Sequence, residues 1–354
     1  MAYLALSTAN LPDPVIDPAQ GASPEDYFNT VLYTGTGAAV DINTVGFQPD
    51  LVWGKKRSAP NQNNWLIDSV RGAGVWLASD GTGAEGTEPA GSSFDADGFN
   101  TNSNSLFTYT GGSYVMWAWK ANGSGVSNTD GSITSTVSAN TTSGFSIVSY
   151  TGDQGTGSTV GHGLNQAPQV VMVKPRNGTT TYGWRVYTEM TGNTKYLNLN
   201  NTDPANTFTD WNSTSPTSSV FTVNSSSPQT VNESGTNYIA YCFHSVDGFS
   251  KIGKYVGNGS TDGPFVYTGF RPAFVIIKRT NSTDSWVIED NKRNTYNVNT
   301  NYLLADSSVA EGSTTIRDFL SNGFKMRSTA QNISGSTYIY MAFAEQPMKF
   351  SNAR

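Results

Sequence analysis

The sequence predicts an all-β protein made of three tandem β-sandwich or jelly-roll-like repeats with an extended N-terminal arm. The composition favours short strands and turns, because the 354 residues include 36 Gly and 15 Pro but only 14% charged residues. The same strand-like motifs also occur three times in the same order, which is the pattern of a tandem repeat. A β-propeller would need more and shorter repeats, whereas a single larger barrel stays open as an alternative.

Two motifs open each repeat. The first is a Tyr-x-Gly turn that closes a strand, at Tyr33, Tyr150 and Tyr255. The second is an apolar run that begins after a Pro and ends in a Lys six residues later, in GFQPDLVWGKKR from Gly46, GLNQAPQVVMVKPR from Gly163 and GFRPAFVIIKR from Gly269. Short β-branched or aromatic runs opened by Pro predict buried strands that begin just after a turn.

Two further motifs close each repeat. A tryptophan follows the Lys in every copy, at Trp65, Trp184 and Trp286. The last shared motif is an aromatic strand, which reads YVMWAWKA from Tyr114, YIAYCFHS from Tyr238 and YIYMAFAE from Tyr338. Its alternation puts Val115, Trp117 and Trp119 on one face in the first copy. Asp97-Gly98 and Asn322-Gly323 precede apolar runs and predict hairpins.

These motifs divide the chain into six segments. We expect an extended arm at 1–26, β repeats at 27–121, 143–247 and 248–346, a polar linker with at most one short strand at 122–142, and a C-terminal tail at 347–354.

The N-terminal arm is rich in proline, which favours extended backbone. One interpretation is a frayed terminus, and the other is an arm that docks on a neighbouring subunit. Aliphatic residues between the prolines favour docking, because a disordered leader is usually more polar. The candidate docking residues are Leu11, Pro12, Pro14, Val15, Ile16 and Pro18.

Charge and composition argue against several kinds of partner. The net charge is −6, so no basic surplus is present to bind nucleic acid. No stretch is apolar enough to span a membrane, and the first residues lack the basic region of a secretory signal. The one Cys, Cys242, and the two His, His162 and His244, argue against a disulfide framework and a multi-histidine metal centre. We therefore expect no cofactor and no metal.

Carboxylates offer the best catalytic candidates, because glycosidases use two of them. The candidates are Asp68, Glu85, Glu88, Glu189, Glu289, Asp290 and Glu311. Asp68 and the pair Glu289 and Asp290 fall at matching points after the repeat tryptophan, and a repeated acid favours a role in the fold or on a solvated surface. The turn Asp95-Ala96-Asp97-Gly98 lacks the complete spacing of a calcium loop.

Other reactive residues have structural interpretations. His162 lies in a Gly-His-Gly turn, and His244 ends an aromatic strand where the other copies have Lys120 and Ala344, which is typical of a variable surface position. Cys242 matches alanines in those copies and is expected to be a small core residue. The repeat tryptophans either form an exposed sugar-binding platform or fill the cores, and a repeated core solution is favoured.

Five stretches of the sequence are distinctive: LPDPVIDPAQGASPEDYFNTVLYTG from Leu11, GFQPDLVWGKKR, SNTDGSITSTVSANTTSGFSIVSYTG, GNGSTDGPFVYTGFRPAFVIIKR and YIYMAFAEQP. They resemble a family of virion structural proteins from marine bacteriophages. Proteins of that family are labelled as a domain of unknown function or as tail-fibre proteins. The resemblance implies a virion protein that is assembled in the host cytoplasm.

The resemblance favours a non-enzymatic structural component of the tail or of an adsorption fibre or spike. Its partners would be other virion proteins, further copies of itself, with a trimer favoured, and a host surface glycan. A head decoration or cement protein is the alternative within this class. A β-sandwich glycan depolymerase is the alternative of another class.

Overall fold

The computed structural model describes residues 11–88, 91–103, 106–177, 182–225 and 230–351. Within these ranges the chain consists of antiparallel strands and turns, with the short 3-10 helices η2 (Pro18–Gln20) and η3 (Pro24–Asp26) before the first strand. No helix among the described residues has the length and apolar character that a membrane crossing requires. The predicted all-β fold class is confirmed.

Unit one, which corresponds to the first predicted repeat, is a sandwich of two sheets. The larger has the strand order β1-β9-β3-β4-β5-β6 and the smaller the order β2-β8-β7. Val52, Ile67, Phe99 and Met116 belong to the core that the two sheets share. The strands are β1 (Phe28–Thr34), β2 (Val40–Ile42), β3 (Leu51–Lys56), β4 (Trp65–Asp68), β5 (Val75–Ala78), β6 (Gly86–Thr87), β7 (Ser93–Asp95), β8 (Gly98–Thr101) and β9 (Ser113–Trp119).

Unit two repeats this plan with a longer main sheet. Its order is β10-β11-β12-β19-β14-β15-β16-β17, and β13 pairs with β18 in a separate sheet. Val148, Val171, Phe221 and Ala240 belong to its core. The strands are β10 (Val126–Asn128), β11 (Ser135–Asn140), β12 (Phe145–Thr151), β13 (Ser158–Gly161), β14 (Val170–Pro175), β15 (Arg185–Thr188), β16 (Lys195–Asn198), β17 (Asn206–Thr207), β18 (Val220–Val223) and β19 (Asn237–Phe243).

Unit three is one sheet that curls on itself. Its order is β20-β27-β22-β23-β24-β25-β26-β21. Tyr255 of β20 and Val266 of β21 lie at opposite ends of this order but share one core, so the sheet is nearly closed. The strands are β20 (Ser250–Val256), β21 (Phe265–Tyr267), β22 (Phe270–Arg279), β23 (Val287–Asp290), β24 (Asn299–Leu304), β25 (Gly312–Leu320), β26 (Gly323–Met326) and β27 (Thr337–Pro347).

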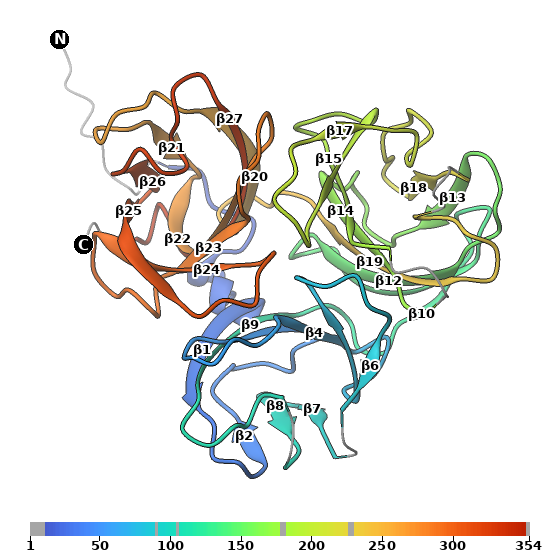
Figure 1. Cartoon of the computed structure of the whole chain (residues 1–354), viewed down its shortest axis with the longest axis horizontal. Helices are drawn as coiled ribbons and strands as arrows, with labels where there is room; N and C mark the ends of the chain where they lie inside the picture. Colours follow the sequence, from blue (N-terminus) through green and yellow to red (C-terminus); the bar gives the residue numbers. More distant parts are fainter. Residues whose placement is uncertain (1–10, 89–90, 104–105, 178–181, 226–229, 352–354) are drawn as a thin grey trace.

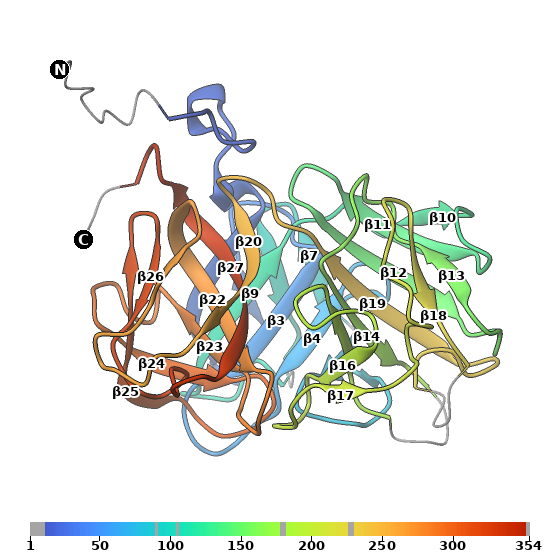
Figure 2. The same cartoon turned by 90° about the horizontal axis from the view of Figure 1, so that it is seen from above.

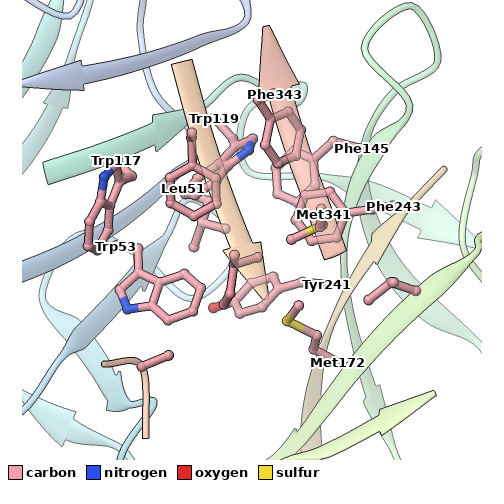
Figure 3. Close-up of a cluster of buried hydrophobic side chains, with 14 of the residues drawn as sticks. Leu51, Trp53, Trp117, Trp119, Phe145, Met172, Tyr241, Phe243, Met341 and Phe343 are labelled. Carbon is pink, nitrogen blue, oxygen red and sulfur yellow. The ribbon is translucent and has the colours of Figure 1, made fainter. Parts of the chain in front are cut away.

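The three units surround a pseudo-threefold axis (Figure 1). Their main sheets face one central core, and β9, β19 and β27 each contribute side chains to it. Trp119, Phe243 and Phe343 occupy equivalent positions on these strands, and their ring centroids are 5.5 to 6.4 Å apart in all three pairs (Figure 3). Each unit therefore packs on a core of its own and on a core shared by all three.

The central strands follow the predicted alternation. Val115, Trp117 and Trp119 point into the shared core, while Met116 and Ala118 point into the core of unit one. Both faces of β9 are buried because the strand lies inside a sheet that is covered on both sides. The two predicted hairpins are also present, as β7–β8 and β25–β26.

The segment 122–142 differs from the predicted polar linker. It forms two strands, β10 and β11, and β11 pairs with β12 along the edge of the sheet of unit two. Ile133 and Val137 of this segment are buried in the core of unit two. Small polar and β-branched residues suit an edge strand as well as a spacer, so composition alone does not separate the two roles.

Candidate functional site: the interfaces between the units

Three buried lysines occupy equivalent positions at the interfaces between the units. Lys55, Lys174 and Lys278 are at most 1% exposed. Each lies opposite the same position of its central strand, in the pairs Lys55–Val115, Lys174–Ile239 and Lys278–Ile339. Val115 and its equivalents are four residues from the aromatic triplet, or about 13 Å along the strand. The lysines therefore lie away from that triplet along the axis.

The lysine ammonium groups link the units in a ring. Lys55 Nζ donates to Ser307 O of unit three at 2.7 Å, Lys174 Nζ to Thr82 O of unit one at 3.0 Å, and Lys278 Nζ to Thr202 O of unit two at 2.8 Å. Each also donates to a carbonyl of its own unit. Burial lowers the pKa of each lysine to about 8, because a charged group is poorly solvated in this site.

Two of the repeat tryptophans form a second link between units. Trp184 Nε1 donates to Ala78 O of unit one, and Trp286 Nε1 donates to Asn198 O of unit two, both at 2.8 Å. Both indole rings belong to the shared central core. Trp65 is buried as well, so the exposed sugar-binding platform is wrong and the core interpretation is confirmed.

Trp65 is not the structural equivalent of the other two tryptophans. Its side chain points into the core of unit one, where it packs on Trp76 with a centroid distance of 4.3 Å. The equivalent residue is Asn64, whose backbone N–H donates to Asp80 as that of Trp286 donates to Asp306. Asn64 Nδ2 also makes the link between units, at 3.0 and 2.9 Å from the two carbonyls at 304 and 305 of unit three.

Substitution of the two kinds of tryptophan should separate these roles. We expect Trp184→Phe to lower the free energy of unfolding by about 1–2 kcal/mol more than Trp65→Phe does. Both changes remove similar ring volume, but only Trp184 loses a hydrogen bond, because Trp65 Nε1 has no partner among the described residues. Urea unfolding of both variants measures the difference, and equal losses would contradict the assigned link.

Two candidate acids of unit one belong to an ion-pair network with unit two. Asp68 pairs with Arg71 at 2.6 Å and accepts a hydrogen bond from the Tyr241 hydroxyl at 2.8 Å. Glu85 lies 3.9 Å from Arg71 and 2.8 Å from Arg176 of unit two. Asp68 and Arg71 have fully buried side chains, so this network supports the interface between units one and two.

An equivalent network joins units three and one. Asp290 pairs with Arg293 at 2.6 Å and accepts a hydrogen bond from Trp117 Nε1 at 3.0 Å. Glu311 continues the network, at 3.0 Å from Arg293 and 2.8 Å from Arg57 of unit one. Burial disfavours the charged form of Arg293, but the carboxylates of Asp290 and Glu311 outweigh it and raise its pKa.

At the described residues, the interface between units two and three has uncharged side chains at the positions of this network. Thr188 takes the place of Asp68 and Asp290, as the pairs Val170–Thr188, Leu51–Asp68 and Phe274–Asp290 show. The other equivalent positions hold Thr191, Ala205, Thr280 and Met341. All five positions hold uncharged residues here. At each of the other two interfaces they hold two acids, two arginines and one Tyr or Trp, so the charged residues are replaced together and no buried charge is left unpaired.

The candidate acids do not come together in one site. Asp68 and Asp290 lie at two different interfaces, and the acids outside these two networks lie elsewhere. Glu289 points into the core of unit three, where it pairs with Arg317, and burial raises its pKa to about 7. Glu189 is exposed and accepts a hydrogen bond from Gln169 at 2.9 Å. Glu88 is buried near the edge of unit one. Among the described residues, no group of three or more His, Cys, Asp or Glu could hold a metal ion.

The histidines and the cysteine have buried structural positions. His162 Nε2 lies 3.1 Å from Thr217 O, and burial lowers the pKa of this imidazole. His244 is 5% exposed, so its expected surface position is wrong, because the turn at Gly144 packs on its ring. Cys242 is fully buried, as expected for a small core residue, and burial raises its pKa to about 12.

The described part of the N-terminal arm, residues 11–26, folds onto its own chain, and residues 1–10 of the predicted arm lie outside the described residues. Leu11, Pro12 and Pro14 line a groove with the loop at 247–248, Tyr267 and the end of β27, and Val15 N–H donates to Asp247 O at 3.3 Å. Figure 2 shows the arm at one end of the molecule, on the same side as the end of β27.

The docking candidates divide between an inner and an outer side of the arm. Ile16 is fully buried in the central core of its own chain, so its predicted docking on a partner is wrong. Pro18 begins η2, where the Asp17 carboxylate accepts a hydrogen bond from the Ala19 N–H at 2.9 Å. Pro12 and Val15 are exposed.

The arm should detach when its buried anchor is shortened. We expect Ile16→Ala to weaken the docking of the arm on the rest of the chain by about 2–4 kcal/mol, because the substitution leaves a cavity in the shared core. Val15→Ala is the control, since Val15 is 64% exposed. Limited proteolysis should cleave the arm faster in the Ile16 variant only. Similar cleavage rates in both variants would show that Ile16 does not hold the arm.

These contacts define a class of protein: an internally triplicated all-β chain whose units are joined by buried polar links. The chain belongs to the family described as "Domain of unknown function (DUF7483)", whose family model matches residues 23–347. No curated protein and no solved structure matches the chain.

Proposed function

We propose that the protein is a non-enzymatic structural component of a bacteriophage virion, located in the tail or in an adsorption fibre or spike. The virion assignment rests on the resemblance of long stretches of the sequence to such proteins. The structural role is supported by one observation: several buried charged residues hold the three units together. Asp68, Asp290 and the three buried lysines all contact a neighbouring unit.

The position of the arm supports a direction of assembly. The arm and the end of β27 lie together at one end of the molecule (Figure 2). Pro12 and Val15 are exposed there, so this end would contact other virion proteins or further copies of the chain. The opposite end would face outward, where contact with a host surface glycan would take place.

Immunogold labelling of intact particles tests the location. A gold label confined to the tail or its fibres supports the proposal, whereas a label spread over the capsid supports a head decoration protein instead. Absence of label on disrupted and intact particles would overturn the virion role.

Val15→Asp should reduce incorporation into particles without unfolding the protein, because the side chain is exposed.

Incubation of the wild-type protein with host polysaccharide tests the non-enzymatic part. Release of oligosaccharides by the wild type would overturn it. The wild type is more informative here than variants of Asp68, Glu289 or Asp290, because these residues are fully buried in ion pairs and their loss would act through folding.

A further inference from the structure

Three equivalent strands differ in what covers their outer edge. β1, β12 and β20 pair with the central strand of their unit in the same register, in the pairs Phe28–Trp119, Phe145–Phe243 and Ser250–Phe343. In unit two, β11 covers the other edge of β12. β1 and β20 instead end the main sheets of units one and three.

The register identifies the backbone groups that face outward from β1. Gly35 N–H donates to Gly112 O at 2.8 Å and Lys120 N–H donates to Tyr27 O at 3.0 Å, so the odd residues of β1 bond to β9. Because the bonding direction alternates along a strand, the N–H and C=O groups of Leu32 and Thr34 point away from the sheet.

In unit two, the equivalent outward-facing N–H and C=O groups of β12 pair with the strand β11. Ser149 of β12 is equivalent to Leu32, and it lies opposite Thr136 of β11. The sequence of β11 is STVSAN, an uncharged strand of small residues. The chain therefore contains an example of a strand that covers this edge.

Among the described residues, local side chains bond to the beginning of the free edges. The Asn29 side chain accepts a hydrogen bond from Thr30 N–H at 2.8 Å, and Ser245 Oγ accepts one from Ile252 N–H in unit three at 2.9 Å. The next outward positions are Leu32 and Thr34 in β1, and both side chains are exposed. A groove lined by Asn29, Thr30, Leu32, Thr44 and Lys292 lies beside β1 as far as Leu32.

Charge distinguishes β1 from β20. β20 reads SKIGKYV, and its two lysines are exposed. Lysines on an edge strand prevent pairing with another chain. β1 reads FNTVLYT and β12 reads FSIVSYT, without any charged residue. β1 thus has the composition of the covered strand and the position of an uncovered one.

We propose that the edge of β1 at Leu32 and Thr34 binds an extended, uncharged, Ser/Thr/Val-rich strand of another polypeptide, which pairs with β1 as β11 pairs with β12. The inference rests on the proposed assembly role and names a surface for it. The main-chain bonds would provide affinity, and the groove beside Lys292 would select the side chains of the incoming strand.

Amide hydrogen exchange of the full chain, followed by NMR, tests the proposal with a synthetic peptide of residues 131–140, which is uncharged and contains β11, as the probe. Near saturation, the peptide should slow the exchange of the Leu32 and Thr34 amides by about tenfold. The Ser149 amide is the internal reference, because β11 already covers it. Unchanged exchange of Leu32 at millimolar peptide would overturn the proposal.

Variants of both partners provide matched controls. Leu32→Pro removes an outward N–H and leaves the bonds to β9, so the fold should persist while the slowing at Thr34 is lost. A peptide with Pro at positions 136 and 138 should have no effect. Equal slowing of amide exchange at Lys254 of β20 would overturn the selectivity for β1. If exchange at Leu32 slows with rising protein concentration in the absence of peptide, a second copy of the chain, and not a partner strand, covers this edge. These results do not depend on where antibodies place the protein on a particle.

Discussion

Replacement of Asp290 by alanine should lower the free energy of unfolding by about 3–5 kcal/mol. The variant leaves the fully buried side chain of Arg293 without its closest carboxylate and removes the acceptor of Trp117 Nε1. Arg293 keeps Glu311 at 3.0 Å, which places the expected loss toward the lower end of this range. Urea unfolding at neutral pH measures the change.

Thr188→Ala is the matched control for this substitution. Thr188 occupies the equivalent position of unit two and is also buried, and Thr191 stands there in place of the arginine. We expect a loss of about 1 kcal/mol, which is ordinary for a buried polar substitution. If the two variants lose the same amount of stability, the ion-pair network has no role at the interface between units three and one.

Stability should rise as the pH increases from about 8 toward 10. Burial lowers the pKa of Lys55, Lys174 and Lys278 to about 8, whereas the ordinary value for an unfolded chain is 10.5. Between these values the unfolded chain binds more protons than the folded chain, so a higher pH favours folding. The gain should be about 2 kcal/mol per lysine between pH 7 and 9.5, measured by urea unfolding across this range.

A lysine variant and the tyrosines give this prediction two controls. Lys174→Met should reduce the rise by about a third, because burial alone lowers the pKa of Lys174 and the three sites are equivalent. Above pH 10 the curve should turn downward, since burial raises the pKa of Tyr150 and Tyr241 and the unfolded chain then loses protons first. Stability that stays constant between pH 8 and 10 would contradict the lowered pKa of the buried lysines.

The repeated strands could be predicted because their signal is local. The Pro-to-Lys spacing of six residues is the same in all copies, and the structure places the three lysines at the same register. The alternation of the aromatic strand also identified which side chains share a face. Local periodicity and turn residues carry this information without any knowledge of the tertiary structure.

The misplaced equivalence of Trp65 shows the limit of matching residue types. A shift of one residue moves a side chain to the opposite face of a strand. The Asp-x-x-Arg motif gives the correct alignment, because Asp68 follows Asn64 by four residues as Asp290 follows Trp286. The sequence therefore contained the signal, but the two adjacent positions compete and tryptophan is the more conspicuous residue.

The polar networks could not be predicted from local patterns. Trp117 and Asp290 are 173 residues apart, and so are Asp68 and Tyr241. Their contact depends on how the three units pack, which no periodicity within a unit determines. The same reason applies to the segment 122–142, whose pairing with β12 depends on a free sheet edge.

The ring of lysines has a consequence for the order of folding during synthesis. The acceptor of Lys55 in unit three is 252 residues further along the chain. Unit one therefore leaves the ribosome with a lysine that cannot obtain this bond until most of unit three has been made. Its final stability depends on the last unit, so closure of the ring should be a late and cooperative step that makes a partial chain vulnerable to aggregation.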